Sequence, residues 1–144
     1  MTFAIDVNPM VYATDIESPF HERARLIMAD MYRGGEIVYL FWPVALGFLR
    51  LVTQPGVLAN PLSPGDATQA ISRLIALPNV RTASENQDFW AELQAVTRGL
   101  VVRGKLFPDA HIVALMRIHG VSTILTHDRD FRKFDGIRIV DPFQ

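Results

Sequence analysis

Two kinds of hydrophobic pattern alternate along the chain. Short apolar runs rich in Ile, Val, Phe and Tyr predict strands, whereas longer segments with apolar residues at helical spacing predict helices. We expect strands at residues 2–5, 36–40, 79–82, 121–126 and 136–140. We expect helices at residues 21–33, 43–52, 63–77, 84–98 and 108–119, with shorter helical turns opening at Asn8-Pro9 and at 129–134.

Helix boundaries are marked by residues with known end preferences. Gly34 and Gly120 follow helical segments, where glycine accepts the left-handed conformation that ends a helix. Ser63 is expected to cap the helix that follows it, with Asp66 at the third position in a capping-box-like arrangement. Ser84 is expected to cap the next helix in the same way.

Strands that alternate with helices indicate an α/β fold with a mostly parallel sheet of four to five strands. Helices should cover both faces, which gives a three-layer α/β/α sandwich. The apolar runs at residues 3–5 and 123–125 fit strands buried on both sides. A length of 144 residues suits a single domain over residues 1–144. In such sheets ligands bind outside the carboxyl ends of the strands.

Composition removes several classes of protein and site. The chain has no cysteine, so a disulfide framework and thiolate chemistry are excluded. No apolar run reaches the length of a membrane span, and Asp6 comes too early for a signal peptide, so we expect a cytoplasmic protein. The net charge of −1 provides no global basic field, so a nucleic-acid partner would need a local basic patch.

Four acids are expected at one edge of the sheet. Asp6 and Asp128 follow strands directly, Asp130 comes two residues later, and Asp109 lies near the start of the helix that leads into the strand before Asp128. Each acid taken alone is equally compatible with a helix cap or a polar loop. Together they would repel one another and raise each other's pKa unless a cation with a preference for oxygen ligands, such as Mg²⁺, were bound.

The histidines offer no competing metal site. His111 and His119 are eight residues apart, two helical turns, which is too far to share one ion. We interpret His127 as a solvated loop residue and His21 as structural. The glycine motifs of dinucleotide and nucleoside-triphosphate sites and the elbow motif of serine hydrolases are missing from the sequence. Metal-assisted attack of water on a phosphodiester is the chemistry that remains.

Basic residues flank the acids in sequence. One group precedes Asp109 and another follows Asp128, and either could attract a polyanion. A solvated surface is an equally good interpretation of both. The two groups are Arg98, Arg103 and Lys105, and Arg129, Arg132 and Lys133.

Five segments carry a resemblance to a known family: FAIDVNPMVYA (3–13), FLRLVTQP (48–55), LFPDAHIVAL (106–115), THDRDF (126–131) and IRIVDP (137–142). In order and spacing they resemble the PIN-domain family, and more closely the VapC toxins of bacterial type II toxin–antitoxin systems. The similarity runs from about residue 2 to residue 142. The resemblance implies a PIN-like sandwich and a Mg²⁺- or Mn²⁺-dependent endoribonuclease. It also implies a homodimer, inhibited by a small VapB-like antitoxin, with RNA as the substrate.

The resemblance also assigns roles to individual residues. It places Asp6, Asp109 and Asp128 as metal ligands, with Asp130 as an auxiliary acid in catalysis. Asn8 and Thr126 would form hydrogen bonds within the site, and Arg50 would contact RNA or pair with an acid; a helix-surface charge is the alternative for Arg50.

One position departs from the family pattern. Many relatives carry Glu three residues before the Arg that matches Arg50, and here that position is Gly47. Glu36 lies at the wrong end of its strand to substitute for it. Without a carboxylate at this position, a second metal site is the feature that the protein would be expected to lack. The alternative function is therefore a catalytically impaired PIN-like domain that binds RNA or protein without cleavage.

Two apolar helical segments are candidates for the dimer or antitoxin surface. Residues 10–12 and 41–51 carry more large apolar side chains than one core face needs. Burial in the core is an equally good interpretation of both segments.

Overall fold

The computed structural model describes residues 2–144. Its strands are β1 (Thr2–Ile5), β2 (Ile37–Phe41), β3 (Val80–Ala83), β4 (Thr123–Leu125) and β5 (Arg138–Val140). Its α-helices are α1 (Val7–Thr14), α2 (His21–Arg33), α3 (Trp42–Thr53), α4 (Pro64–Ile75), α5 (Phe89–Thr97) and α6 (Leu106–Ile118), and a 3₁₀-helix η1 spans Arg129–Lys133.

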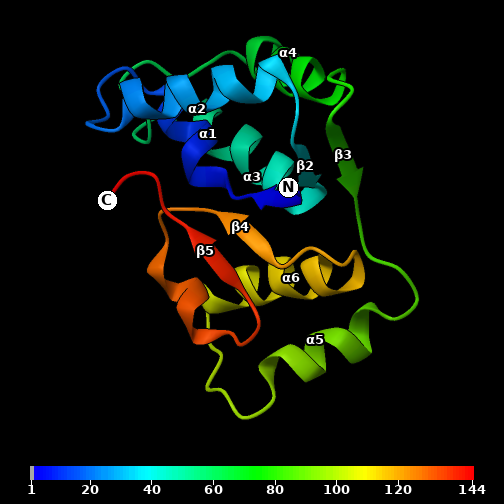
Figure 1. Ribbon diagram of the computed structural model, residues 1–144. Helices are drawn as coiled ribbons and strands as arrows, with labels where there is room; N and C mark the ends of the chain where they lie inside the picture. The colour runs from blue at the N-terminus through cyan, green and yellow to red at the C-terminus, as the bar shows by residue number, and fades with distance from the viewer. Residues whose placement is uncertain (1) are drawn as a thin grey trace.

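The five strands form one parallel sheet in the order β3-β2-β1-β4-β5. Helices α1 to α4 gather on one side of the sheet and α5 and α6 on the other (Figure 1). The predicted α/β sandwich with a mostly parallel sheet is thus confirmed. Among the helices within residues 2–144, none combines the length and apolar character that crossing a bilayer requires.

The strand order reverses between β1 and β4. The chain moves outward from β1 through β2 to β3, then returns to the other side of β1 to form β4 and β5. Ala4 pairs with Ile124 and Ile5 pairs with Leu125, so the two central strands end side by side. This is the switch point at which open α/β sheets bind their ligands.

The core is continuous around these central strands. All three residues of β4 are buried, and α6 buries an unbroken run from Ile112 to Met116. Phe131 of η1 is fully buried, which anchors the short helix that follows β4. The residues just outside the end of β4 are therefore fixed to the core on both sides.

Two of the predicted helix boundaries are confirmed by their geometry. The Ser63 hydroxyl accepts a hydrogen bond from the Asp66 N–H at 3.1 Å, as expected of a cap. Helix α2 ends at Gly34, whose φ of 82° lies in the left-handed region that glycine adopts without strain.

The predicted cap at Ser84 is wrong, because α5 begins only at Phe89. Within the intervening loop, the Asn86 side chain accepts the Asp88 N–H at 2.9 Å, which forms a local turn in place of helix. Two histidines hold this loop. His111 within α6 contacts Glu85 at 2.5 Å, and His119, which follows the last residue of α6, contacts the carbonyl of residue 84 at 2.9 Å.

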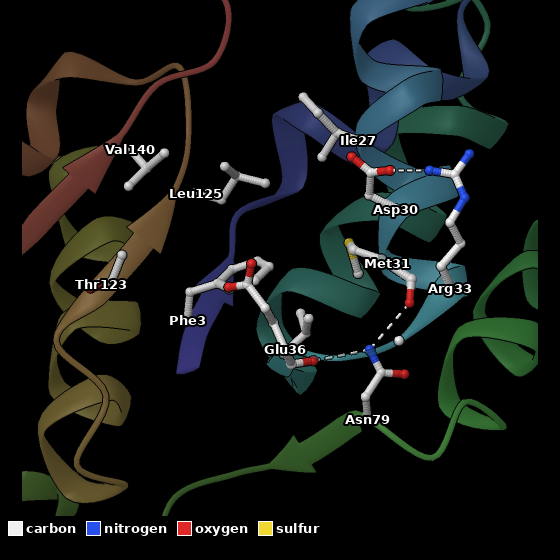
Figure 2. Close-up of a pocket in the computed structure, with 12 residues that line it drawn as sticks. Phe3, Ile27, Asp30, Met31, Arg33, Glu36, Asn79, Thr123, Leu125 and Val140 are labelled. Atoms are coloured by element: carbon white, nitrogen blue, oxygen red, sulfur yellow. Dashed lines mark hydrogen bonds and ion pairs between the residues drawn. The ribbon is translucent and has the colours of Figure 1, made fainter. Parts of the chain in front are cut away.

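A cavity of about 430 Å³ lies between α2 and the sheet (Figure 2). Phe3, Thr123 and Val140 line its sheet side, and Ile27 and Met31 line its helix side. None of the four acids expected at the edge of the sheet, Asp6, Asp109, Asp128 and Asp130, lines this cavity.

Truncation of Phe131 should destabilise the fold strongly. Phe131→Ala removes a fully buried ring, so we expect the free energy of unfolding to fall by about 3–5 kcal/mol in urea denaturation. Phe107→Ala is the matched control, since that ring is 47% exposed and its loss should cost about 0.5 kcal/mol. Equal losses in the two variants would contradict the placement of Phe131.

Candidate active site

Asp6 is fixed where β1 passes into α1. Its N–H donates to the carbonyl of Leu125 at 3.0 Å, which continues the pairing of β1 with β4. Its side chain caps α1, because Oδ1 accepts the Val7 N–H at 2.7 Å. Oδ2 accepts the Thr126 hydroxyl at 2.7 Å. The carboxylate is therefore buried and held on both oxygens.

Thr126 and Asn8 connect the ends of β1 and β4. The Thr126 Oγ1 accepts the Asn8 side-chain amide at 3.2 Å and the Asp128 N–H at 3.0 Å. Asn8 Nδ2 also lies 3.4 Å from Asp6 Oδ2, and Asn8 Oδ1 accepts the His127 N–H at 3.1 Å. Both residues thus make hydrogen bonds to the predicted acid site.

Asp128 and Asp130 lie on the turn that leads into η1. Asp128 caps η1, with its Oδ1 accepting the Asp130 N–H at 2.9 Å. Asp109 approaches from the first turn of α6. Asp109, Asp128 and Asp130 each offer one carboxylate oxygen, and these oxygens lie within 4.8 Å of one another. Asp109 is thereby brought close to two acids that follow it by 19 and 21 residues in the sequence.

Negative charge is concentrated at this edge. Burial, together with the charges of Asp128, Asp6 and Asp130, raises the pKa of Asp109 to about 7, while the charge of Lys105 opposes this shift. Burial also raises the pKa of Asp6, against hydrogen bonds from Thr126 and Val7 that lower it. The convergence of these carboxylates therefore destabilises the folded state electrostatically.

The donor set suits a hard divalent cation. Carboxylate oxygens are the preferred ligands of Mg²⁺, and the positive charge would remove the repulsion that raises the pKa of Asp109. Asp6 lies outside the group of three, although it is close enough to affect Asp109. The assignments of Asp6, Asp109 and Asp128 as metal ligands and of Asp130 as an auxiliary acid stay predictions.

One lysine from each predicted basic group faces the acids. Lys105 lowers the pKa of Asp109 by its charge, and Lys133 Nζ lies 3.3 Å from Asp130 Oδ1. Arg50 is different: it is exposed on the last turn of α3 and forms no ion pair within residues 2–144. Its predicted contact with RNA or an acid stays a prediction.

Gly47 of α3 lies beside α1. A Cβ built there would meet Val7 Cγ2 at 3.8 Å, an ordinary van der Waals contact. Packing at that point therefore does not require glycine. Glu36 precedes β2, at the opposite end of that strand from α3, so it does not substitute at this position.

The interpretation of His127 as a solvated loop residue is wrong. Its side chain is 29% exposed, and Nδ1 lies 2.9 Å from Asp141 Oδ2. Tyr12, next to these groups, was missed by the sequence analysis; burial raises the pKa of its hydroxyl, and the charges of Asp141, Asp6 and Asp128 add to that effect. His127 lies in a loop and Tyr12 lies in α1, and neither the loop composition nor the apolar pattern of that short helix indicates these polar contacts.

Comparison with known proteins decides the family. The PIN domain model matches residues 3–137 of this chain. The chain belongs to the PIN-domain family. Within it, the protein named Ribonuclease VapC48 from Mycobacterium tuberculosis is 49% identical over 143 residues, which cover 99% of both chains. Ribonuclease VapC43 from the same organism is 30% identical and covers 93% of this chain and 90% of its own.

Two solved structures share the fold at low sequence identity. The crystal structure of VapC20 from Mycobacterium tuberculosis, a toxin that cleaves the sarcin-ricin loop, matches with a TM-score of 0.68 at 19% identity, covering 94% of this chain and 98% of that one. FitAcB from Neisseria gonorrhoeae matches with a TM-score of 0.62 at 16% identity, covering 100% and 99%. These likenesses confirm the architecture.

The pKa of Asp109 predicts an unusual pH dependence. Its folded value of about 7 lies above the ordinary 3.8, so the folded state binds this proton more tightly than the unfolded state does. The contribution of Asp109 to stability is therefore lost as pH rises from about 4 to 7. In chelator, Asp109→Asn should flatten this decline and raise the Tm at pH 8, as measured by scanning calorimetry.

Asp66→Asn is the matched control, because Asp66 is an exposed acid in the first turn of α4. It should leave the slope of Tm against pH unchanged. If Asp109→Asn lowered the Tm at pH 8 instead, the charge of Asp109 would be stabilising and the crowding argument would be wrong.

Proposed function

We propose that this protein is a metal-dependent endoribonuclease that acts as the toxin of a type II toxin–antitoxin pair, built as a single PIN-like domain over residues 1–144. The observation that carries the proposal is the convergence of the Asp109, Asp128 and Asp130 carboxylates at the switch point of the sheet. The identity of 49% with a protein named as a ribonuclease supports the same activity.

The cation is Mg²⁺, for which Mn²⁺ can substitute. Asp6, Asp109 and Asp128 would hold it, and Asp130 would assist. When bound, such an ion neutralises charge on the phosphodiester and makes a water easier to deprotonate. The fit rests on the oxygen donor set and on the raised pKa of Asp109, both of which favour added positive charge.

The chain's own residues orient these groups and the substrate. Thr126 and Asn8 fix the Asp6 carboxylate by hydrogen bonds. Asp130, whose side chain is 28% exposed, would orient the attacking water and accept its proton. Lys105 and the Lys133 ammonium supply positive charge to attract the RNA backbone next to the acids.

The protein partners are a small VapB-like antitoxin and a second copy of this chain. Two of the solved neighbours are complexes, a VapBC2 assembly from Rickettsia felis bound to promoter DNA and a toxin–antitoxin complex from Klebsiella pneumoniae. Helix α3 buries Val44 and Phe48 in the core but leaves Trp42 and Leu46 39% and 63% exposed. Its outer face is therefore available for such a contact, while its inner face is core.

The second candidate is a domain that binds RNA without cleaving it. Gly47 favours this candidate, because a carboxylate is missing there beside α1. The retained cluster of acids opposes it, since a pure binder gains nothing from carboxylates that repel one another and the RNA.

Cleavage of RNA distinguishes the two candidates. The antitoxin-free protein, incubated with total cellular RNA, should produce discrete fragments in Mg²⁺ and in Mn²⁺ but not in chelator. Asp6→Asn should slow cleavage at least about 100-fold, because it removes a charge from the site while its amide can still accept the Thr126 hydroxyl. Gel electrophoresis and sequencing of fragment ends measure both effects.

Asp66→Asn serves again as the matched acid outside the site and should cleave like the wild type. Intact RNA in every lane, from protein shown to be folded, would count against the nuclease. Retarded migration of uncleaved RNA under the same conditions would favour the binding domain.

Replacement of Gly47 tests whether this position matters for more than a missing carboxylate. Gly47→Ala in the interior of α3 should raise the free energy of unfolding by about 1 kcal/mol, because alanine loses less backbone entropy and the added methyl group meets only an ordinary contact. Urea denaturation measures the change, and Gly65→Ala in the first turn of α4 is the control with a smaller expected gain. RNA cleavage should not change; a large fall would mean that substrate approaches the backbone at Gly47.

A further inference from the structure

His127 connects the acid-bearing turn to the C-terminal segment. Nδ1 of its ring contacts both carboxylate oxygens of Asp141, at 3.1 and 2.9 Å. The Asp141 side chain is only 7% exposed, so this carboxylate is almost withdrawn from water. A carboxylate only accepts hydrogen bonds, which means that Nδ1 of His127 carries the proton.

Asp141 is itself held in place just after β5. Its Oδ1 accepts the Phe143 N–H at 3.0 Å, which forms a tight turn at the end of the chain. The carbonyl of Pro142 accepts the Arg23 guanidinium at 3.3 Å, which ties the same segment to α2. The carboxylate that contacts His127 therefore belongs to a fixed part of the molecule.

Aromatic rings surround the imidazole. The rings of Phe20, Phe143 and Tyr12 lie 4.8, 5.7 and 6.2 Å from that of His127, each in an edge-to-face arrangement. This packing limits rotation of the imidazole, so the hydrogen bond to Asp141 has a defined direction.

The backbone of His127 is restrained as well. Its N–H donates to Asn8 Oδ1, and its neighbours in sequence are Thr126, which binds Asp6, and Asp128, which caps η1. The turn is thus attached to β1 through Thr126 and to the C-terminal segment through His127. Repulsion among the carboxylates would otherwise tend to open the turn before a cation arrives.

We propose that His127 and Asp141 are positioning residues: Asp141 holds the His127 ring through Nδ1 and thereby fixes the turn that brings Asp128 and Asp130 toward Asp109. This inference rests on the proposed function, because it requires these carboxylates to serve a cation. The pair touches neither the cation nor the substrate and acts through the geometry of the turn.

The test compares two replacements of His127 that separate the hydrogen bond from the ring packing. His127→Asn keeps a side-chain N–H near the place of Nδ1 but loses the ring, whereas His127→Phe keeps a ring and loses the donor. His119→Phe is the matched control, since His119 is also packed against aromatic rings and makes one side-chain hydrogen bond, to the carbonyl of residue 84. The dissociation constant for Mn²⁺ is measured by titration calorimetry on the full chain.

We expect His127→Phe to weaken Mn²⁺ binding about 10- to 100-fold, the range found when groups that orient metal ligands are removed. His127→Asn should stay within about three-fold of the wild type, because the donor to Asp141 is retained. His119→Phe should leave the affinity unchanged. In chelator, amide hydrogen exchange at residues 127–130 should accelerate in His127→Phe and not in His127→Asn.

Two results would overturn the proposal: unchanged affinity in His127→Phe, or a greater loss in His127→Asn than in His127→Phe, which would assign the effect to ring packing. If His127→Phe does not fold, Asp141→Ser carries the same expectation, because its hydroxyl can accept the Phe143 N–H but does not reach Nδ1. If the wild type cleaves RNA and all variants bind Mn²⁺ equally well, the positioning role of His127 and Asp141 is wrong while the nuclease function stands. If the wild type and the variants show the expected order of Mn²⁺ affinities but the wild type leaves RNA intact, the proposed nuclease function is wrong and the positioning role of His127 and Asp141 is supported.

Discussion

Repulsion among the carboxylates of Asp109, Asp128 and Asp130 is the force that the surrounding structure must resist. The three side chains come within 4.8 Å of one another, and burial of Asp109 strengthens the repulsion by lowering the local dielectric. The stabilising interactions around them lie mostly outside the acids: the hydrogen bond from Thr126 to Asp6, the buried ring of Phe131 and the continuous core behind α6. The free energy gained by burying the core maintains an arrangement that the charges alone would not adopt.

The parallel sheet determines where that force acts. Because β1 and β4 are neighbours and both run in the same direction, everything that follows their last residues shares one edge. Asp6 and Asp128 lie at the same edge of the sheet for this reason. Asp109 comes to the same edge because the crossover that returns the chain to β4 starts α6 there.

The strands, the helices and the meeting of the acids could be predicted from the sequence, because period and strand direction are local signals with a defined spatial meaning. The start of α5 could not be predicted. Ser84 is a residue type that often caps a helix, but the Asn86 turn and contacts from α6 extend the loop to Phe89. The environment of His127 was also missed, since its partner Asp141 lies 14 residues away on the far side of β5. Contacts of this kind depend on tertiary packing, which no short motif encodes.

The hydrogen bond between Thr126 and Asp6 joins residues 120 positions apart. Synthesis proceeds from the N-terminus, so a chain still on the ribosome has made Asp6 long before β4 exists. Strand β1 then lacks one of its two neighbours, and the acids of the β4–η1 turn have not yet been added. The nascent chain therefore cannot bring Asp109, Asp128 and Asp130 together until that turn has been added, so any chemistry that depends on the three carboxylates appears late in synthesis.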